Sequence, residues 1–119
     1  MYRPEHEKLE VYGRAVAVAK ELEEVAKAIP SYRYDLSDQL RRASSSFVLN
    51  LAEGANEFSA NDKAKFYRIA RRSAGECLAI IDLVAPMLAP PMQATTRSEL
   101  LAVMETLDKL AHAVLRRRP

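Results

Sequence analysis

The sequence is poor in the residues that staple small secreted domains or build sheets. Among 119 residues there is one cysteine, Cys77, so no internal disulfide can form, which fits a reducing cytoplasm. Three glycines, no tryptophan and 7% aromatic residues do not favour a fold rich in strands. The polar start shows no signal peptide, and the most apolar stretch, 77–91, is broken by Asp82 and prolines. We expect a cytoplasmic protein with no membrane contact.

Residues that carry common catalytic and metal chemistry are equally scarce. His6 and His112 are the only histidines, and neither follows a glutamate by three residues, as a di-iron bundle requires. Asp108 and His112 lie four residues apart, but an isolated pair of this kind is more often a surface contact. The sequence has no glycine-rich phosphate loop, no metal-spaced cysteine set and no serine elbow. We therefore expect a protein that is not an enzyme and has no catalytic residue, metal or cofactor.

What the sequence does contain is helix-forming periodicity. Hydrophobic residues make up 49% and charged residues 29%, which is typical of a folded chain, and 119 residues suit one domain, 1–119. Apolar residues recur every three or four positions in four segments, about 5–29, 35–53, 60–88 and 97–116. Because short loops join these segments, the pattern predicts an all-α fold, an up-down-up-down antiparallel four-helix bundle.

Local signals predict where the helices begin and end. The core stripe of the first helix is expected to consist of Leu9, Tyr12, Val16, Ala19, Leu22, Ala26 and Ile29. Gly54 is expected to stop the second helix in a left-handed conformation. Ser59 and Asp62 resemble a capping box for the third helix, which Pro86 should kink or end. Thr96 is expected to cap the fourth.

A stripe of polar residues follows the core face of the second helix and continues on the third. Asn50 stands alone in the otherwise apolar segment 47–52, which needs cover either from the rest of the bundle or from a second subunit. A solvated face is the simpler interpretation, but we favour a partly buried network between helices or subunits, with Arg42 and Glu76 as a complementary pair. The predicted network consists of Gln39, Arg42, Ser46, Asn50, Glu53, Ser73 and Glu76.

Basic residues are concentrated in two places although the net charge is only +2. Residues 62–72 carry a local net charge of +4, and three arginines follow at 116–118. Such clusters indicate an acidic partner, although basic faces are often only solvated and no aromatic residues are interleaved for base stacking. The candidate nucleic-acid contacts are Lys65, Arg68, Arg71, Arg72, Arg116, Arg117 and Arg118.

Several strings resemble a known family. The string 38–46, Asp-Gln-Leu-Arg-Arg-Ala-Ser-Ser-Ser, and the string 50–54, Asn-Leu-Ala-Glu-Gly, are specific in combination. With Ser59, Phe66, Ser73 and Glu76 they are similar to the four-helix bundle proteins encoded in 23S ribosomal RNA intervening sequences, over about residues 6–90. The family's usual phenylalanine is replaced by Lys63, and its usual glycine before the serine by Arg72.

The resemblance implies a cytosolic bundle that assembles as a ring-like homo-oligomer, a pentamer among relatives, without catalytic activity. A more distant similarity to accessory proteins of diversity-generating retroelements implies nucleic acid as a partner. Two hypotheses follow. In the first, the chain is a homo-oligomeric scaffold or interaction protein, which the apolar segment 47–52 and Phe58 favour. In the second, it is an accessory protein that binds RNA through its basic face and tail. A metal or cofactor enzyme is the remaining, least supported class.

Overall fold

The computed structural model describes residues 1–117 and contains four long helices that pack against one another. These helices are α1 (Glu10–Ala28), α2 (Tyr34–Asn56), α3 (Ala60–Val84) and α4 (Ala94–Arg116). Three short 3₁₀ helices, η1 (Glu5–Lys8), η2 (Ser31–Arg33) and η3 (Ala85–Met87), lie between or before them. Residues 1–117 include no strand, so the all-α prediction is confirmed.

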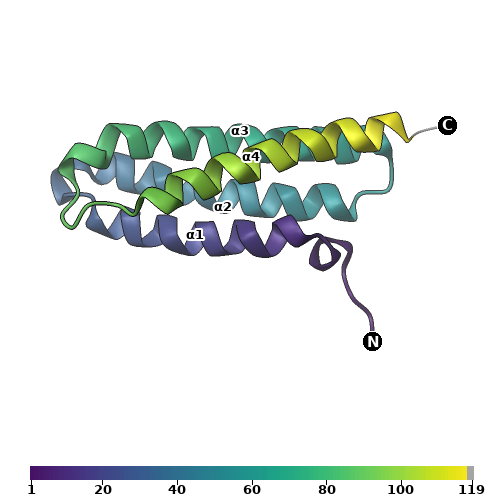
Figure 1. Ribbon diagram of the computed structural model, residues 1–119, viewed down its shortest axis with the longest axis horizontal. Helices are drawn as coiled ribbons and strands as arrows, with labels where there is room; N and C mark the ends of the chain where they lie inside the picture. Colours follow the sequence, from purple (N-terminus) through teal and green to yellow (C-terminus); the bar gives the residue numbers. More distant parts are fainter. Residues whose placement is uncertain (118–119) are drawn as a thin grey trace.

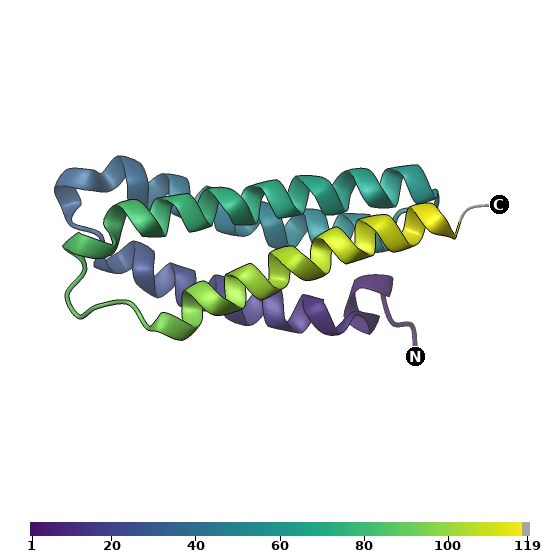
Figure 2. The ribbon, with the colours of Figure 1, turned by 45° about the horizontal axis from the view of Figure 1, so that its top comes forward.

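The helices form an elongated body of 51 × 29 × 23 Å. The start of α1 and the end of α4 lie at the same end of this body (Figure 1). Helices α1 and α3 each pack against both α2 and α4, which Figure 2 shows from a second side. Every helix therefore has two helical neighbours and at least one face turned to solvent.

The core runs along the bundle axis and is built from all four helices. Its largest fully buried side chains are Phe47, Leu22, Leu40, Leu51, Ile81, Leu100 and Leu107, and Cys77 is buried among them. The predicted stripe of α1 is wrong in phase over its first half. Val11, Ala15 and Val18 face the core, whereas Val16 and Ala19 are only half-buried. Two apolar lines run side by side on α1, and periodicity alone does not say which one faces inward.

The predicted start of the first helix near residue 5 is also wrong. Residues Glu5–Lys8 form η1, and Leu9 is extended, with φ −92° and ψ 124°, before α1 begins. Asn56 at the end of α2 accepts a hydrogen bond from the Glu5 backbone N–H (3.1 Å) and contacts His6 Nδ1 at 2.8 Å. This contact turns η1 onto α2, so the helix does not continue through it.

Gly54 does not stop α2, contrary to the prediction. The helix continues to Asn56, and no residue from 1 to 117 has a positive φ. A Cβ at Gly54 would lie 2.8 Å from Cδ1 of the Tyr67 ring and 3.2 Å from the backbone oxygen of Lys63. Gly54 is therefore needed for the close approach of α3, not for a turn.

The ends of α3 and the start of α4 give mixed outcomes. The Ser59 cap is confirmed, because Ser59 Oγ accepts a hydrogen bond from the Asp62 backbone N–H at 3.0 Å. The helix ends at Val84, four residues earlier than expected, and Pro86 lies in η3 as a break. The predicted cap of α4 is wrong: the helix begins at Ala94, and Thr96 is a buried residue inside it.

Candidate functional site

The centre of the predicted polar stripe joins α2 to α3. Ser46 Oγ and Ser73 Oγ share a hydrogen bond of 2.8 Å across the two helices. The Asn50 amide donates to the backbone carbonyl of Ser46 at 2.8 Å and to its hydroxyl at 3.1 Å. All three residues are half-buried. Hydrogen bonds in this part of the stripe therefore link α2 to α3, and a role in setting their register stays a prediction.

The outer members of the stripe do not join that network within the chain. Arg42 is 73% exposed in its side chain and pairs with Asp38, one turn earlier on α2, at 2.8 Å. The predicted pair of Arg42 with Glu76 is absent from the described residues, because Asp38 is the nearer carboxylate on the same helix. Gln39, Glu53 and Glu76 are exposed. They leave a polar rim around the serine pair that is open to solvent.

One residue of the predicted basic face of α3 is paired with an acidic side chain of α4, and the other three are not. Arg71 Nε lies 2.8 Å from the carboxylate of Asp108 on α4, so this charge is already compensated inside the chain. Lys65, Arg68 and Arg72 are exposed, and none has an acidic partner among residues 1–117. The Lys65 ammonium lies 5.5 Å from the centre of the Phe66 ring, a cation–π contact.

The structure describes two of the three arginines of the predicted basic tail. Arg116 and Arg117 are exposed at the end of α4, whereas Arg118 lies outside the described residues.

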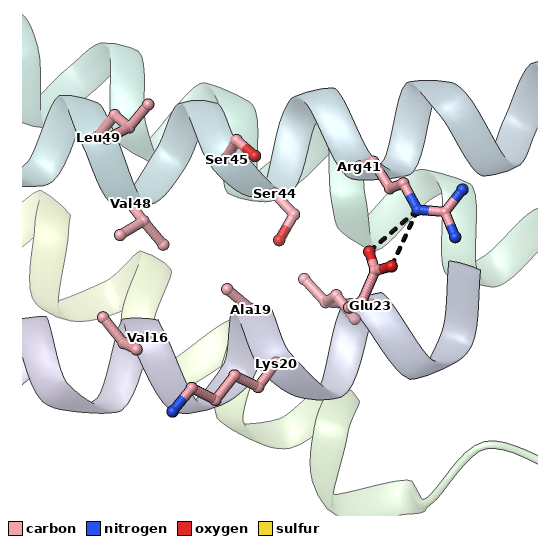
Figure 3. A pocket seen from close by; sticks show the side chains of 10 residues that line it. Val16, Ala19, Lys20, Glu23, Arg41, Ser44, Ser45, Val48 and Leu49 are labelled. Carbon is pink, nitrogen blue, oxygen red and sulfur yellow. Dashed lines mark hydrogen bonds and ion pairs between the residues drawn. The ribbon is translucent and has the colours of Figure 1, made fainter. Parts of the chain in front are cut away.

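A groove between α1 and α2 forms a partly apolar recess on the surface of the bundle. Its volume is about 490 Å³. Figure 3 shows the side chains of the two helices that line it. Half of its ten lining residues are aliphatic, and Leu49 stands at its rim with 67% of its surface exposed. The residues that line it are Val16, Ala19, Lys20, Leu22, Glu23, Arg41, Ser44, Ser45, Val48 and Leu49.

Charged residues border this groove on both helices. Arg41 Nε donates to both carboxylate oxygens of Glu23, at 3.1 and 3.0 Å, and so bridges α1 and α2 at one end. Lys20 extends from α1 beside the groove, and no carboxylate among residues 1–117 pairs with it (Figure 3). The groove is therefore an apolar recess with one uncompensated positive charge at its edge.

The loop between α2 and α3 presents the most exposed aromatic side chain of the chain. Phe58 is 100% exposed. The residue before it, Glu57, lies close enough to Glu53, Asp62 and Lys63 to interact with their charges. The pKa of Glu57 is raised, first by the loss of water around it and then by repulsion from Glu53 and Asp62. An apolar side chain thus projects from an acidic surface.

The surroundings of Cys77 and of the two histidines do not suggest a catalytic or metal-binding role. Burial raises the pKa of the Cys77 thiol to about 12, and the charge of Glu76 adds to the shift. His6 packs edge-on against Tyr12 with ring centres 4.6 Å apart. His112 is exposed, and the carboxylate that lies four residues before it, Asp108, pairs with Arg71 instead. In the described part of the chain, no three metal-ligating side chains gather into one group.

Sequence reasoning missed the residues that tie the loops and line the groove. Lys63 reaches back to the end of α2, where its ammonium donates to the carbonyl of Ala55 at 2.8 Å. The position of Lys63 in the first turn of α3, nine residues after Gly54, could have indicated that its side chain reaches the end of α2. Asn56 and Lys20 carried no signal beyond polarity.

Within residues 1–117, no helix is long and apolar enough to cross a membrane.

Two comparisons with known proteins bear on the identity of the chain. A search of curated proteins finds no significant match to the chain. The sequence model of one family, described as "23S rRNA-intervening sequence protein", matches residues 7–111. That match spans all of α1, α2 and α3 and most of α4, including the serine pair and the groove. The chain therefore belongs to the 23S rRNA-intervening sequence protein family.

Proposed function

We propose that this chain is a non-enzymatic interaction protein that works as a homo-oligomer of four-helix bundles. The observation that carries the proposal is the apolar α1–α2 groove, about 490 Å³ in volume, beside the exposed side chain of Leu49. A large contiguous apolar patch rimmed by polar groups marks a site that binds a protein, a membrane or a ligand. A second subunit is the partner present wherever the chain itself is present.

The arrangement of the bundle is part of the same proposal. Short connections and the placement of the start of α1 and the end of α4 at one end support an up-down-up-down antiparallel order. Family resemblance supports a ring, with five copies as the expected number. An intracellular location is consistent with a chain whose single cysteine is buried and unpaired.

Light scattering on purified protein tests self-assembly. The unmodified chain should elute with a mass that is a multiple of 13.3 kDa, and Leu49→Glu should shift it towards 13.3 kDa with helicity unchanged. A surface charge at Leu49 leaves the core intact, so the loss reports the interface. If the unmodified chain has the mass of a single copy at tens of micromolar, the proposal fails.

A second candidate function is RNA binding by the α3 face. It is favoured by Lys65, Arg68 and Arg72, which are exposed and have no acidic partner among residues 1–117. In an oligomer this face would be repeated, and a repeated weak patch gains affinity through avidity.

The ion pair of Arg71 provides a gain-of-function test of this second candidate. Asp108→Asn releases Arg71, so affinity for RNA in an anisotropy titration should rise by about tenfold or less and depend more steeply on salt. Arg68→Glu should lower it. If neither substitution changes an affinity that falls with salt, the α3 face does not bind RNA.

A further inference from the structure

We propose that Phe58 of one copy inserts into the α1–α2 groove of a neighbouring copy. The inference rests on the proposed self-assembly and identifies the two surfaces that meet. The side chain of Phe58 is called the knob below. The groove is the recess lined by Val16, Ala19, Val48 and Leu49 with Lys20 at its edge.

The groove offers an apolar surface that its own chain leaves uncovered. Val16 and Ala19 of α1 and Val48 of α2 are only half-buried although all are aliphatic, and Leu49 is 67% exposed. Figure 3 shows Val16, Ala19 and Val48 facing the space between the two helices, whereas Leu49 lies at the rim and points away from α1. Closing that space with an apolar group would remove their surface from water, which is the main driving force of protein association.

The knob is a large apolar side chain held in one place. Phe58 lies in a three-residue loop whose flanks are fixed, because the Glu57 backbone N–H donates to the Glu53 carbonyl at 3.0 Å and Ser59 caps α3. The loop loses little freedom on binding, so the ordering cost that opposes association is small. Aromatic side chains of this kind are frequent anchors at the centre of interfaces.

The knob cannot reach the groove of its own chain. Leu49 and Asn56 are seven residues apart on α2, which places them about 10 Å apart along the helix axis. Beyond Asn56 the chain continues to the end of the bundle, away from the groove (Figure 1). Only a second copy can bring Phe58 to Leu49. A contact between two different surfaces of identical chains is heterologous, and such contacts close into rings when the rotation permits.

Charge complementarity selects this occupant. Glu57, next to Phe58 in sequence, is repelled by Glu53 and Asp62 more strongly than it is attracted by Lys63, whose ammonium also donates to the carbonyl of Ala55. Lys20 at the groove has no carboxylate partner among residues 1–117. Docking the knob would bring the Lys20 ammonium towards Glu57, relieving the repulsion among the carboxylates and compensating the lysine.

A mixing experiment tests the contact. Phe58→Glu removes the knob and leaves the groove intact, whereas Leu49→Glu blocks the groove and leaves the knob intact. Each variant alone should fall from the mass of the assembly to that of a single copy, with at least a tenfold weaker association. An equimolar mixture should form a complex of two chains, because one intact knob meets one intact groove.

Three further single variants and one double variant test whether the result depends on folding or on surface charge in general. Leu83→Glu changes a leucine of α3 that is 61% exposed and lies outside the groove, so it should keep the mass of the unmodified chain. Lys20→Glu and Glu57→Lys should each weaken association about tenfold, and the double variant should restore it. Helicity by circular dichroism should match the unmodified chain throughout.

The outcomes separate this inference from the proposed function. If the unmodified chain assembles but Phe58→Glu and Leu49→Glu do so equally well, the knob-in-groove contact is wrong and self-assembly stands. The same holds if the mixture of the two variants stays monomeric, or if Leu83→Glu alone dissociates the assembly. If the unmodified chain is itself monomeric, self-assembly fails first.

Discussion

The ammonium group of Lys63 donates a hydrogen bond of 2.8 Å to the carbonyl oxygen of Ala55, near the carboxyl end of α2. The last carbonyls of a helix lack partners within the helix, and a cation there also opposes the negative end of the helix dipole. A side chain from the first turn of α3 therefore satisfies a backbone carbonyl at the end of α2.

Replacing Lys63 by methionine keeps most of the apolar stem and removes this donor. We expect Lys63→Met to lower the free energy of unfolding in urea by about 0.3–1 kcal/mol. Lys109→Met is the matched control, because Lys109 makes only an exposed pair with Glu105 on its own helix. Equal losses in the two variants would show that the contact with Ala55 contributes nothing.

The glycines of α1 and α2 should respond to alanine in opposite directions. At Gly54 the new Cβ would meet the Tyr67 ring and the Lys63 backbone, so Gly54→Ala should destabilise the fold by about 1–3 kcal/mol. At Gly13 nothing lies within 4 Å of the new Cβ, so Gly13→Ala should stabilise it by about 0.5–1 kcal/mol. Thermal unfolding of both variants measures the signs, and two effects of the same sign would contradict this packing.

The hydroxyl pair between Ser46 and Ser73 should appear as a coupling energy. Ser46→Ala and Ser73→Ala remove the same hydrogen bond, so their losses should not add. We expect a coupling of about 0.5–1.5 kcal/mol in a double-mutant cycle measured by urea unfolding. Additive losses would mean that the two hydroxyls do not interact in solution.

The Cys77 thiol should be inert in the folded chain. Burial raises its pKa from the ordinary 9.0 to about 12, so the thiolate that reacts with disulfide reagents is not formed at pH 8. A chromogenic disulfide reagent should label Cys77 only after denaturant is added.

The same shift gives a pH dependence. The unfolded thiol ionises near pH 9 and the folded thiol only near pH 12, so the unfolded state binds fewer protons between these values. The contribution of Cys77 to stability is therefore complete below pH 9 and is lost as pH rises towards 12. Cys77→Ala should show a shallower decline of stability than the unmodified chain over this range. Identical declines would contradict the buried position of the thiol.

Features of the fold that depend on neighbours in sequence were predictable. The four helices follow from apolar periodicity, the cap at Ser59 from its spacing to Asp62, and the break after α3 from Pro86. Each depends on side chains within about one helical turn, where spacing determines contact.

Features that depend on distant contacts were not predictable. The start of α1 is displaced because Asn56, fifty residues after His6, holds η1 on α2. Arg71 belongs to the predicted basic face, but Asp108 from α4 compensates its charge. The groove arises because the second apolar line of α1, with Val16, faces α2 instead of the core. No local pattern distinguishes these partners from others of the same chemical type.

Sedimentation equilibrium of the unmodified, nucleic-acid-free chain tests the central claim most directly. Self-assembly predicts a mass that is a whole multiple of 13.3 kDa over a range of concentrations, with five copies expected from the family resemblance. A constant mass of 13.3 kDa up to tens of micromolar would contradict it.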